Sequence, residues 1–268
     1  MSQSSLDLGQ VFALEPHGPD TYVGESPPYS WGRIYGGLVI AQALWAATLT
    51  VRPEHRVHSL HAYFILGGDP REPVRYEVDR LRNGRSFTTR AVTARQSGGA
   101  ILNLSCSFQV DEEGPETQSA TFPSDATVPE GEGVAWDAGA QRLDVEIPHA
   151  PRSLSWVRYP NTLDDDLRIH ACALAYLSDV NPMTAVGNSH PDGPISDGAW
   201  RTQYMSASLD HAMWFHRPTR VDDWLLIDMT GHGVIGSRGL ATGLVYTADG
   251  IHVATIAQEG LLRQRRPT

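Results

Sequence analysis

The amino-acid sequence predicts an α+β fold made of two tandem units, each a helix packed on an antiparallel sheet. A buried helix followed by four strands is predicted between residues 36 and 110, and the same order of elements recurs after residue 161. An acidic segment with several prolines separates the two regions. We therefore assign residues 1–110 to an N-terminal unit, 111–160 to a linker and 161–268 to a C-terminal unit. Two unrelated α+β modules are the alternative to an internal duplication.

The N-terminal unit begins with a predicted helix over residues 36–50, whose apolar residues cover more than one stripe, as in a mostly buried helix. Gly36 and Gly37 stand at its start, where backbone N–H groups have no partner within the helix. Four segments in which apolar and polar residues alternate then predict an antiparallel meander, with glycine-containing turns between strands. The predicted strands are 58–65, 74–81, 86–96 and 101–110.

The C-terminal unit repeats this order. A predicted helix over residues 165–178 has one apolar face, and aspartates stand at its start, where carboxylates interact favourably with the helix dipole. A turn-rich loop is expected over residues 187–198. The predicted strands that follow are 207–216, 224–229, 239–246 and 251–261.

The composition excludes several classes of protein. The chain has 268 residues and a formal net charge of −10, which does not suit nucleic-acid binding. It contains no lysine, which excludes a P-loop lysine and a Schiff-base lysine. The apolar runs are too short to span a bilayer and the first residues lack a secretory pattern, so we expect a cytoplasmic protein without stable membrane insertion. Cys106 and Cys172 are too few for a disulfide framework or a zinc site, and we interpret both as buried thiols.

A few polar residues stand out in apolar surroundings. Asp179 follows the second predicted helix, where a carboxylate opposes the helix dipole, although a simple helix-ending turn is an alternative interpretation. Gln258 interrupts an apolar strand, where a buried amide requires partners. Ser208 begins another predicted strand and offers a hydroxyl. Asp210 and His211 are neighbours on that strand and face opposite sides, so we do not expect them to form a catalytic dyad.

Several longer motifs resemble the acyl-CoA thioesterase II family. They lie at residues 35–44, 57–64 and 81–87 in the N-terminal half, and at residues 165–170, 209–218 and 257–263 in the C-terminal half. The Asp-His-x-Met-Trp-Phe-His-Arg-Pro run at 210–218 is the most specific of them. The resemblance covers nearly the whole chain and implies a double hotdog fold, in which the two sheets join side by side, and acyl-CoA hydrolase activity.

The resemblance also implies a set of catalytic residues. The family's aspartate corresponds to Asp179, its hydroxyl residue to Ser208, where many relatives have threonine, and its glutamine to Gln258. Asp179 would act as general base on a water that Ser208 and Gln258 hold. Leu38 departs from the family pattern, since relatives usually have glutamine at that position. We expect no metal and no other cofactor.

The chemistry of a thioester substrate points to further candidates. The backbone N–H groups of Gly36 and Gly37 are candidates for stabilising the oxyanion, because glycine lets a ligand approach a helix N-terminus. The phosphates of coenzyme A require positive charge, which here only arginine supplies. Arg82, Arg85 and Arg238 are the candidates for this role, and solvated surface arginines are the alternative interpretation.

We expect a homo-oligomer that binds acyl-CoA, and two other functions remain open. A non-catalytic acyl-CoA binding protein would keep the fold and lose the water site. A double-hotdog enoyl-acyl hydratase would need an aspartate and a histidine several residues apart after a helix, and no histidine follows Asp179 before His190.

Overall fold

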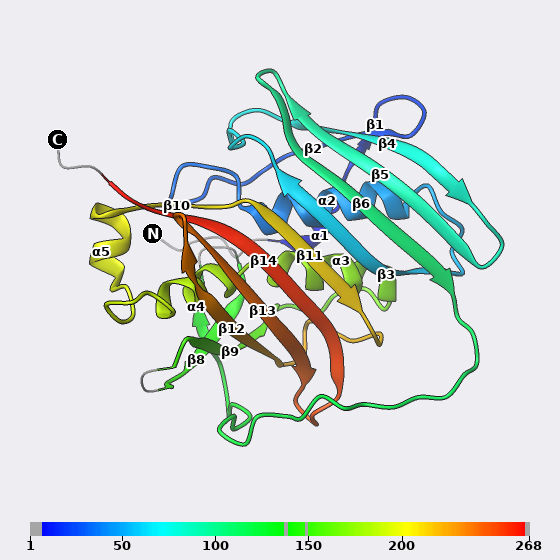
Figure 1. Cartoon of the computed structure of the whole chain (residues 1–268). Coiled ribbons are helices and arrows are strands. Elements are labelled where there is room, and N and C mark those ends of the chain that lie inside the picture. The colour runs from blue at the N-terminus through cyan, green and yellow to red at the C-terminus, as the bar shows by residue number, and fades with distance from the viewer. Residues whose placement is uncertain (1–6, 137–138, 148–149, 266–268) are drawn as a thin grey trace.

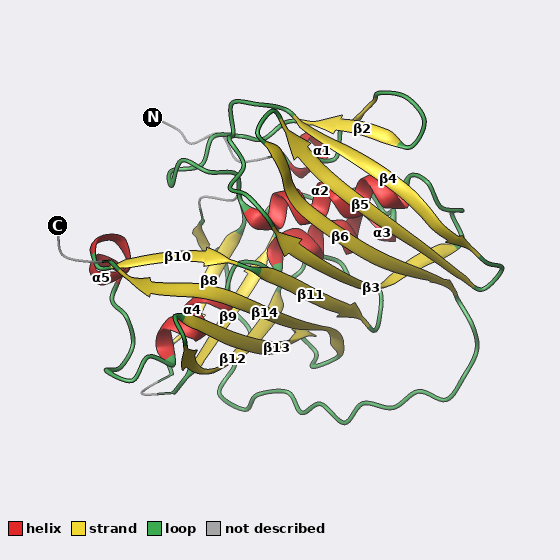
Figure 2. Ribbon diagram, turned by 45° about the horizontal axis from the view of Figure 1, so that its top comes forward, coloured by secondary structure: helices red, strands yellow, loops and turns green. Residues whose placement is uncertain are grey.

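The strands of the protein form one antiparallel sheet, and two long helices lie against one of its faces (Figures 1 and 2). The structure, a computed structural model, describes residues 7–136, 139–147 and 150–265. The two helices are α2 (Gly36–Thr48) in the N-terminal unit and α3 (Leu167–Leu177) in the C-terminal unit. The α+β class predicted from the sequence is confirmed.

The N-terminal unit has the predicted order of one long helix and four long strands. Helix α2 is buried along nearly its whole surface, because the sheet covers one side and the second helix covers another. Strand β5 alternates between buried and more exposed residues, as a strand with one face on the core does. The elements are α1 (Leu8–Val11), β1 (Glu15–Pro16), β2 (Thr21–Gly24), α2, β3 (His55–Phe64), β4 (Val74–Asn83), β5 (Phe87–Gln96) and β6 (Gly99–Val110).

The C-terminal unit contains the repeated helix and meander, with added short elements. Helix α3 begins at a capped end, since the Asp166 side chain accepts a hydrogen bond from the Arg168 backbone N–H. Its elements are α3, α4 (Pro182–Asn188), α5 (Asp197–Thr202), β10 (Tyr204–Ser208), β11 (Asp210–Phe215), β12 (Leu225–Ile235), β13 (Arg238–Thr247) and β14 (His252–Gln264). Three strands lie before it, in the predicted linker: β7 (Val134–Ala135), β8 (Gln141–Val145) and β9 (Arg152–Arg158).

The two units join through a seam between β3 and β11, which pair in antiparallel fashion with Leu60 opposite Met213. The strand order is β1-β2-β4-β5-β6-β3-β11-β14-β13-β12-β9-β8-β7, and β10 pairs with β14 beside this path. Helices α2 and α3 pack on each other, so that Leu44 of one and Leu174 of the other belong to a single hydrophobic core. The prediction that the two sheets join side by side is confirmed.

The segment 111–160 is less irregular than the sequence predicts. Its second half forms β8 and β9, and β9 extends the C-terminal sheet by pairing with β12. Alternate residues of β9, Leu154 and Trp156, pack with Leu226 in a second, smaller core. Strands β8 and β9 were not predicted from the sequence, because they are short and carry polar residues between the apolar ones. The position of the unit boundaries remains a prediction.

Two other local features differ from the predicted elements. The predicted strand 207–216 is divided at Leu209, whose N–H donates to the Glu259 carbonyl while its own carbonyl accepts from the Phe64 N–H. Helix α4 was not predicted. It approaches the sheet so closely that a side chain at Gly231 would place its Cβ 2.2 Å from the Ala185 carbonyl oxygen. The division at Leu209 matters for the site, because it leaves Ser208 at the end of β10.

Candidate active site

The start of α2 and the end of α3 meet at Asp179, two residues after the end of α3. One carboxylate oxygen of Asp179, Oδ2, accepts a hydrogen bond of 3.0 Å from the Gly37 backbone N–H, which belongs to the first turn of α2. A Cβ at Gly36 would lie 2.6 Å from the same oxygen. Only glycine therefore allows the carboxylate to sit against this turn, where backbone N–H groups favour negative charge.

Ser208 and Gln258 complete the cluster from two neighbouring strands. The Gln258 side chain is 1% exposed, and its Nε2 donates a hydrogen bond of 2.8 Å to Ser208 Oγ. Both side chains interact with the Asp179 carboxylate closely enough to lower its pKa. Because Ser208 Oγ accepts from Gln258, its own proton remains available for Asp179 or for a water molecule. The structure thus brings together the three residues that the resemblance implies.

The electrostatics of this cluster favour a proton acceptor that works near neutral pH. Burial raises the pKa of the Asp179 carboxyl from its usual value to about 6, and the hydrogen bonds from Gln258, Gly37 and Ser208 oppose this rise. The residue nevertheless keeps a small accessible surface. Above pH 6 the carboxylate is ionised and is a stronger base than an ordinary aspartate, which suits the activation of water.

His211 contacts Gln258 and so helps to position the cluster, a role that the sequence did not predict. The ring is 1% exposed; its Nδ1 lies 2.5 Å from Gln258 Oε1 and its Nε2 lies 2.8 Å from Ser178 Oγ. Burial lowers the pKa of His211 to about 4, so the ring is neutral at physiological pH. Since Oε1 only accepts, Nδ1 carries the proton and Nε2 is an acceptor. The single Ser178 hydroxyl proton lies between two acceptors, Nε2 and the Ala175 carbonyl oxygen, each 2.8 Å from Oγ.

The position of His211 could have been suspected from its motif, yet its contacts could not. It lies on the inner face of the sheet with Gln258, whereas Asp210 accepts a hydrogen bond from the Glu259 backbone N–H. The expectation that Asp210 and His211 do not act as an adjacent dyad agrees with these contacts. The signal that would have pointed to His211 is the pairing of β11 with β14, which no local pattern reveals.

Comparison with known proteins identifies the family. Residues 26–109 match the sequence profile described as the acyl-CoA thioesterase N-terminal domain, and residues 106–262 match the profile of the C-terminal domain. The chain belongs to the acyl-CoA thioesterase family. It is 34% identical to the acyl-CoA thioesterase 2 of Haemophilus influenzae, in an alignment that covers 98% of this chain and 99% of that relative.

Solved structures agree with this family assignment. An acyl-CoA thioesterase II from Mycobacterium marinum matches with a TM-score of 0.83 at 34% identity, covering 97% of this chain and 98% of that one. A protein with a hot dog fold from Alicyclobacillus acidocaldarius matches with a TM-score of 0.77 at 19% identity, over 97% of this chain and 98% of that one, and so supports the fold alone. The double hotdog fold implied by the sequence is confirmed.

The glycines at the start of α2 have different surroundings in this thioesterase fold. The Gly37 N–H is taken up by Asp179, whereas no described residue accepts a hydrogen bond from the Gly36 N–H. Gly36 is therefore the better placed of the two for an oxyanion. Leu38, which departs from the family pattern, is fully buried in the core and offers no polar group to the site.

The arginines predicted to bind coenzyme A lie in two places, with Arg82 and Arg85 in one and Arg238 in the other. The buried Arg90 guanidinium donates to the carbonyl oxygens of Arg82 and Thr50, which places Arg82 beside the C-terminal end of α2. Arg85 follows in the turn between β4 and β5 and is exposed. A helix of 13 residues is about 18 Å long, so both lie about that far from Gly36. Arg238 is nearer to Gln258 along the sheet and pairs with Glu259 at 2.9 Å.

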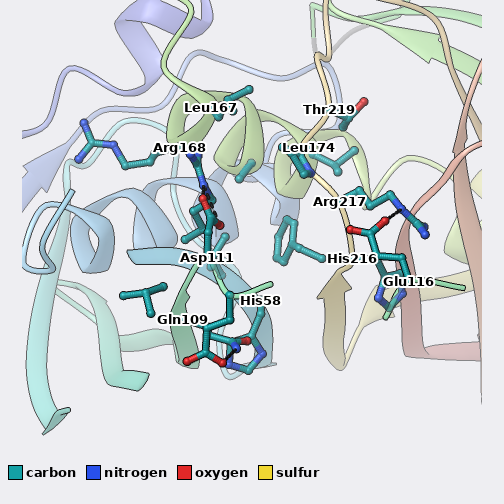
Figure 3. A pocket seen from close by; sticks show the side chains of 17 residues that line it. His58, Gln109, Asp111, Glu116, Leu167, Arg168, Leu174, His216, Arg217 and Thr219 are labelled. Atoms are coloured by element: carbon teal, nitrogen blue, oxygen red, sulfur yellow. Dashed lines mark hydrogen bonds and ion pairs between the residues drawn. The ribbon is translucent and has the colours of Figure 1, made fainter. Parts of the chain in front are cut away.

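A cavity of about 490 Å³ opens at the other end of the seam, near the start of α3, and contains none of the predicted catalytic residues (Figure 3). Its lining mixes apolar side chains such as Leu174 with polar ones, among them Arg56, Arg168 and Arg217. These cations already have carboxylate partners, since Arg217 Nε lies 3.8 Å from Glu116 and the Arg56 Nε–H forms a bifurcated hydrogen bond with both carboxylate oxygens of Asp111. The arginines of this cavity are therefore not free to hold an anion, and the candidate catalytic residues lie elsewhere, around Asp179.

Two further properties bear on cofactors and membranes. Within residues 7–136, 139–147 and 150–265, no group of three or more histidine, cysteine, aspartate or glutamate side chains is arranged to hold a metal ion. No helix in the described part of the chain has the length and apolar character needed to cross a membrane. Cys106 and Cys172 are both buried free thiols, as the sequence predicts.

Proposed function

We propose that this protein hydrolyses acyl-CoA thioesters to free fatty acid and coenzyme A, with a water molecule activated by Asp179. The observation that carries the proposal is the cluster of Asp179, Ser208 and Gln258 in a member of the acyl-CoA thioesterase family, with the pKa of Asp179 raised to about 6. The assignment is supported by alignments with relatives named acyl-CoA thioesterases, which extend over nearly the whole of this chain.

The chemistry suits these residues. Ser208 and Gln258 hold the water, and Asp179 takes a proton from it as the water oxygen attacks the thioester carbonyl carbon. The carbonyl oxygen becomes an oxyanion, which the unoccupied N–H of Gly36 stabilises. The tetrahedral intermediate collapses by breaking the C–S bond, and the proton on Asp179 passes to the departing sulfur. A thiol with a pKa of about 8.5 leaves without a strong acid, so a single aspartate suffices.

The activity is tested by following free thiol release from a panel of acyl-CoAs with the purified full-length chain. We expect turnover without added metal or nucleotide, and an unchanged rate in the presence of a chelator. Loss of activity with chelator, restored by a divalent ion, would contradict the water mechanism proposed here. Binding of acyl-CoA without thiol release would favour a non-catalytic binding protein, and hydration of an enoyl-CoA would favour a hydratase.

Two finer expectations belong to the same proposal. The sequence predicts a homo-oligomer and a cytoplasmic location, which are tested by light scattering of the purified chain and by fractionation of cells that express it. The predicted contacts of Arg82, Arg85 and Arg238 with coenzyme A are tested together with the arginines considered next.

A further inference from the structure

The arginines of this protein divide into paired and unpaired groups. The chain carries a net charge of −10, and most described arginines form an ion pair with aspartate or glutamate. The paired residues are Arg52, Arg56, Arg71, Arg75, Arg80, Arg95, Arg142, Arg152, Arg168, Arg217, Arg220 and Arg238. Six exposed arginines have no such partner among the described residues, and their positive charge is left for a ligand: Arg33, Arg82, Arg85, Arg201, Arg263 and Arg265.

Three unpaired and exposed arginines surround β10, the strand that ends at Ser208. Arg33, in the loop before α2, lies with Nη2 at 3.5 Å from the Ser206 carbonyl oxygen. Arg263 stands opposite Met205 in the pairing of β10 with β14. Arg265 donates from Nε to the Tyr204 carbonyl oxygen at 3.0 Å. We call Arg33, Arg263 and Arg265 the β10 arginine patch.

Strand β10 has a second feature that suits a ligand. It pairs with β14 on one side, and the described part of the chain places no strand on its other side. A strand edge without a partner presents backbone N–H and C=O groups that can bind an extended ligand. The weak contact of Arg33 with the Ser206 carbonyl lies at this position. The edge leads directly to Ser208 and the catalytic cluster.

We propose that the β10 arginine patch binds the phosphates of coenzyme A, with the pantetheine arm lying along the free edge of β10. This inference rests on the proposed thioesterase function and names the part of the site that recognises the nucleotide. The pantetheine arm carries two amides, which match the hydrogen-bonding groups of a strand edge. The patch is cationic on a chain of net negative charge, so it attracts a polyanion that most of the surface repels.

The distances along the strand fit this arrangement. The arm of coenzyme A from the sulfur to the first phosphorus has about as many bonds as four residues of backbone. When extended, it therefore spans about 14 Å. At about 3.3 Å per residue, Arg263 lies about 17 Å along β14 from Gln258, and Arg265, just past the end of that strand, about 23 Å. Arg263 and Arg265 are an odd number of residues from Gln258, so their side chains leave the exposed face of the sheet whereas Gln258 faces the core. The pantetheine arm would therefore cross the free edge of β10 between the phosphates and the thioester.

The test compares two substrates that share an acyl chain but differ in the nucleotide. One is the acyl-CoA that the wild-type protein hydrolyses fastest, and the other is the same acyl group on N-acetylcysteamine, which lacks phosphates and adenine. We expect Arg33→Gln, Arg263→Gln and Arg265→Gln each to lower kcat/KM for acyl-CoA roughly 10-fold, because each loses a charge-assisted hydrogen bond. Hydrolysis of the truncated thioester should stay unchanged. Added salt should reproduce this selectivity in the wild type.

Arg52→Gln is the matched control. Arg52 is an exposed arginine beyond the other end of α2, with a side chain 74% exposed, and its removal changes the net charge equally. Equal losses for both substrates in the patch variants, or no loss, would overturn the proposal. A nucleotide-selective loss in Arg82→Gln or Arg85→Gln, with the patch variants unaffected, would overturn it in favour of the other end of α2.

The experiment also separates failure of this inference from failure of the proposed function. If the wild type hydrolyses neither thioester, the function is wrong, and calorimetric titration with coenzyme A itself then tests the patch. Weaker binding of coenzyme A by the triple patch variant, with binding by Arg52→Gln unchanged, supports the patch. Equal affinities for the wild type and the triple variant reject it.

Discussion

At the scale of single residues, the site depends on a carboxylate that protein surroundings make more basic. We predict that Asp179→Asn lowers turnover roughly 10²–10⁴-fold while acyl-CoA binding remains nearly intact, because asparagine keeps the shape and cannot accept the proton of water. Ser208→Ala and Gln258→Ala should also lower turnover. When either is combined with Asp179→Asn, the fold-losses of the single variants should not simply multiply, because all three residues act on one water. Steady-state thiol release and equilibrium binding measure the two quantities.

A folded Asp179→Asn protein that keeps more than about half of the wild-type turnover would refute the assignment of the base. The alternative interpretation, in which Asp179 only ends a helix, predicts that outcome, because asparagine suits helix ends equally well.

The raised pKa of Asp179 also predicts a pH profile. The base works in its ionised form, so kcat should rise with pH through about 6 and level off above it. An aspartate with its ordinary pKa of about 3.9 would be fully ionised at pH 5 and give a flat profile there. The rates between pH 4.5 and 8 with one acyl-CoA distinguish the two cases, provided that the fold is intact at each pH.

His211 is predicted to act on the reaction by positioning Gln258. His211→Leu removes the Nδ1–H donor and leaves the buried Gln258 amide oxygen without a partner. We expect the free-energy cost of that lost hydrogen bond to lower turnover roughly 10–100-fold. His211→Asn retains a donor near the position of Nδ1 and should recover part of the loss. KM should change little in either variant. Similar kcat values for the two variants, at similar folded content, would indicate a packing role only.

At the scale of secondary-structure elements, the contact between α2 and α3 shapes the site, and its two glycines should respond differently to substitution. In Gly36→Ala the new Cβ meets Asp179 Oδ2 at 2.6 Å and the Phe64 ring at 3.0 Å, so the carboxylate must move. A shift of about 1 Å in a reacting group can lower turnover roughly 100-fold. We therefore predict a folded protein with low kcat.

Gly37→Ala is the comparison. Its Cβ would lie 2.3 Å from the Tyr176 carbonyl oxygen, which is backbone of α3, so relief requires the helices to separate. We predict a loss of stability larger than for Gly36→Ala, measured by thermal unfolding of both variants. A Gly36→Ala enzyme with full activity would show that Asp179 does not need its present position.

At the scale of the whole molecule, the burial of the Asp179 carboxylate lowers stability. Its pKa of about 6 in the folded protein lies above the value of about 3.9 expected in the unfolded chain, so the folded state binds its proton more tightly. The penalty is absent below pH 4, grows between pH 4 and 6, and is constant above. Asp179→Asn should therefore be more stable than the wild type by about 1–3 kcal/mol at pH 8. Denaturant unfolding at pH 4.5 and 8 checks that this difference shrinks as the pH falls.

The two units share one core, so we expect them to unfold together. Buried residues of both α2 and α3 belong to the same hydrophobic cluster, and β3 and β11 form a continuous ladder. Calorimetry should give one cooperative transition for the full-length chain. Two separated transitions would show that the seam contributes little to stability.

The sequence by itself determined the class of fold, the order of the main elements and the family. These properties lie in local periodicity, in turn residues and in long motifs such as 210–218, which are all readable along the chain. It also pointed to Asp179, Ser208 and Gln258 through the resemblance. Short strands such as β8 and β9 were not predicted, because their alternation of apolar and polar residues is too brief to distinguish a strand from a loop.

Only the tertiary structure decided how the site works. Asp179 and Gly37 are 142 positions apart, and their hydrogen bond exists because α2 and α3 pack end to start. The pKa of Asp179 depends on how much water its neighbours exclude, and the role of His211 depends on strand register; neither is a property of a segment. Arg56 has a carboxylate partner and Arg33 has none among the described residues, because pairing is set by contacts between segments far apart in the chain.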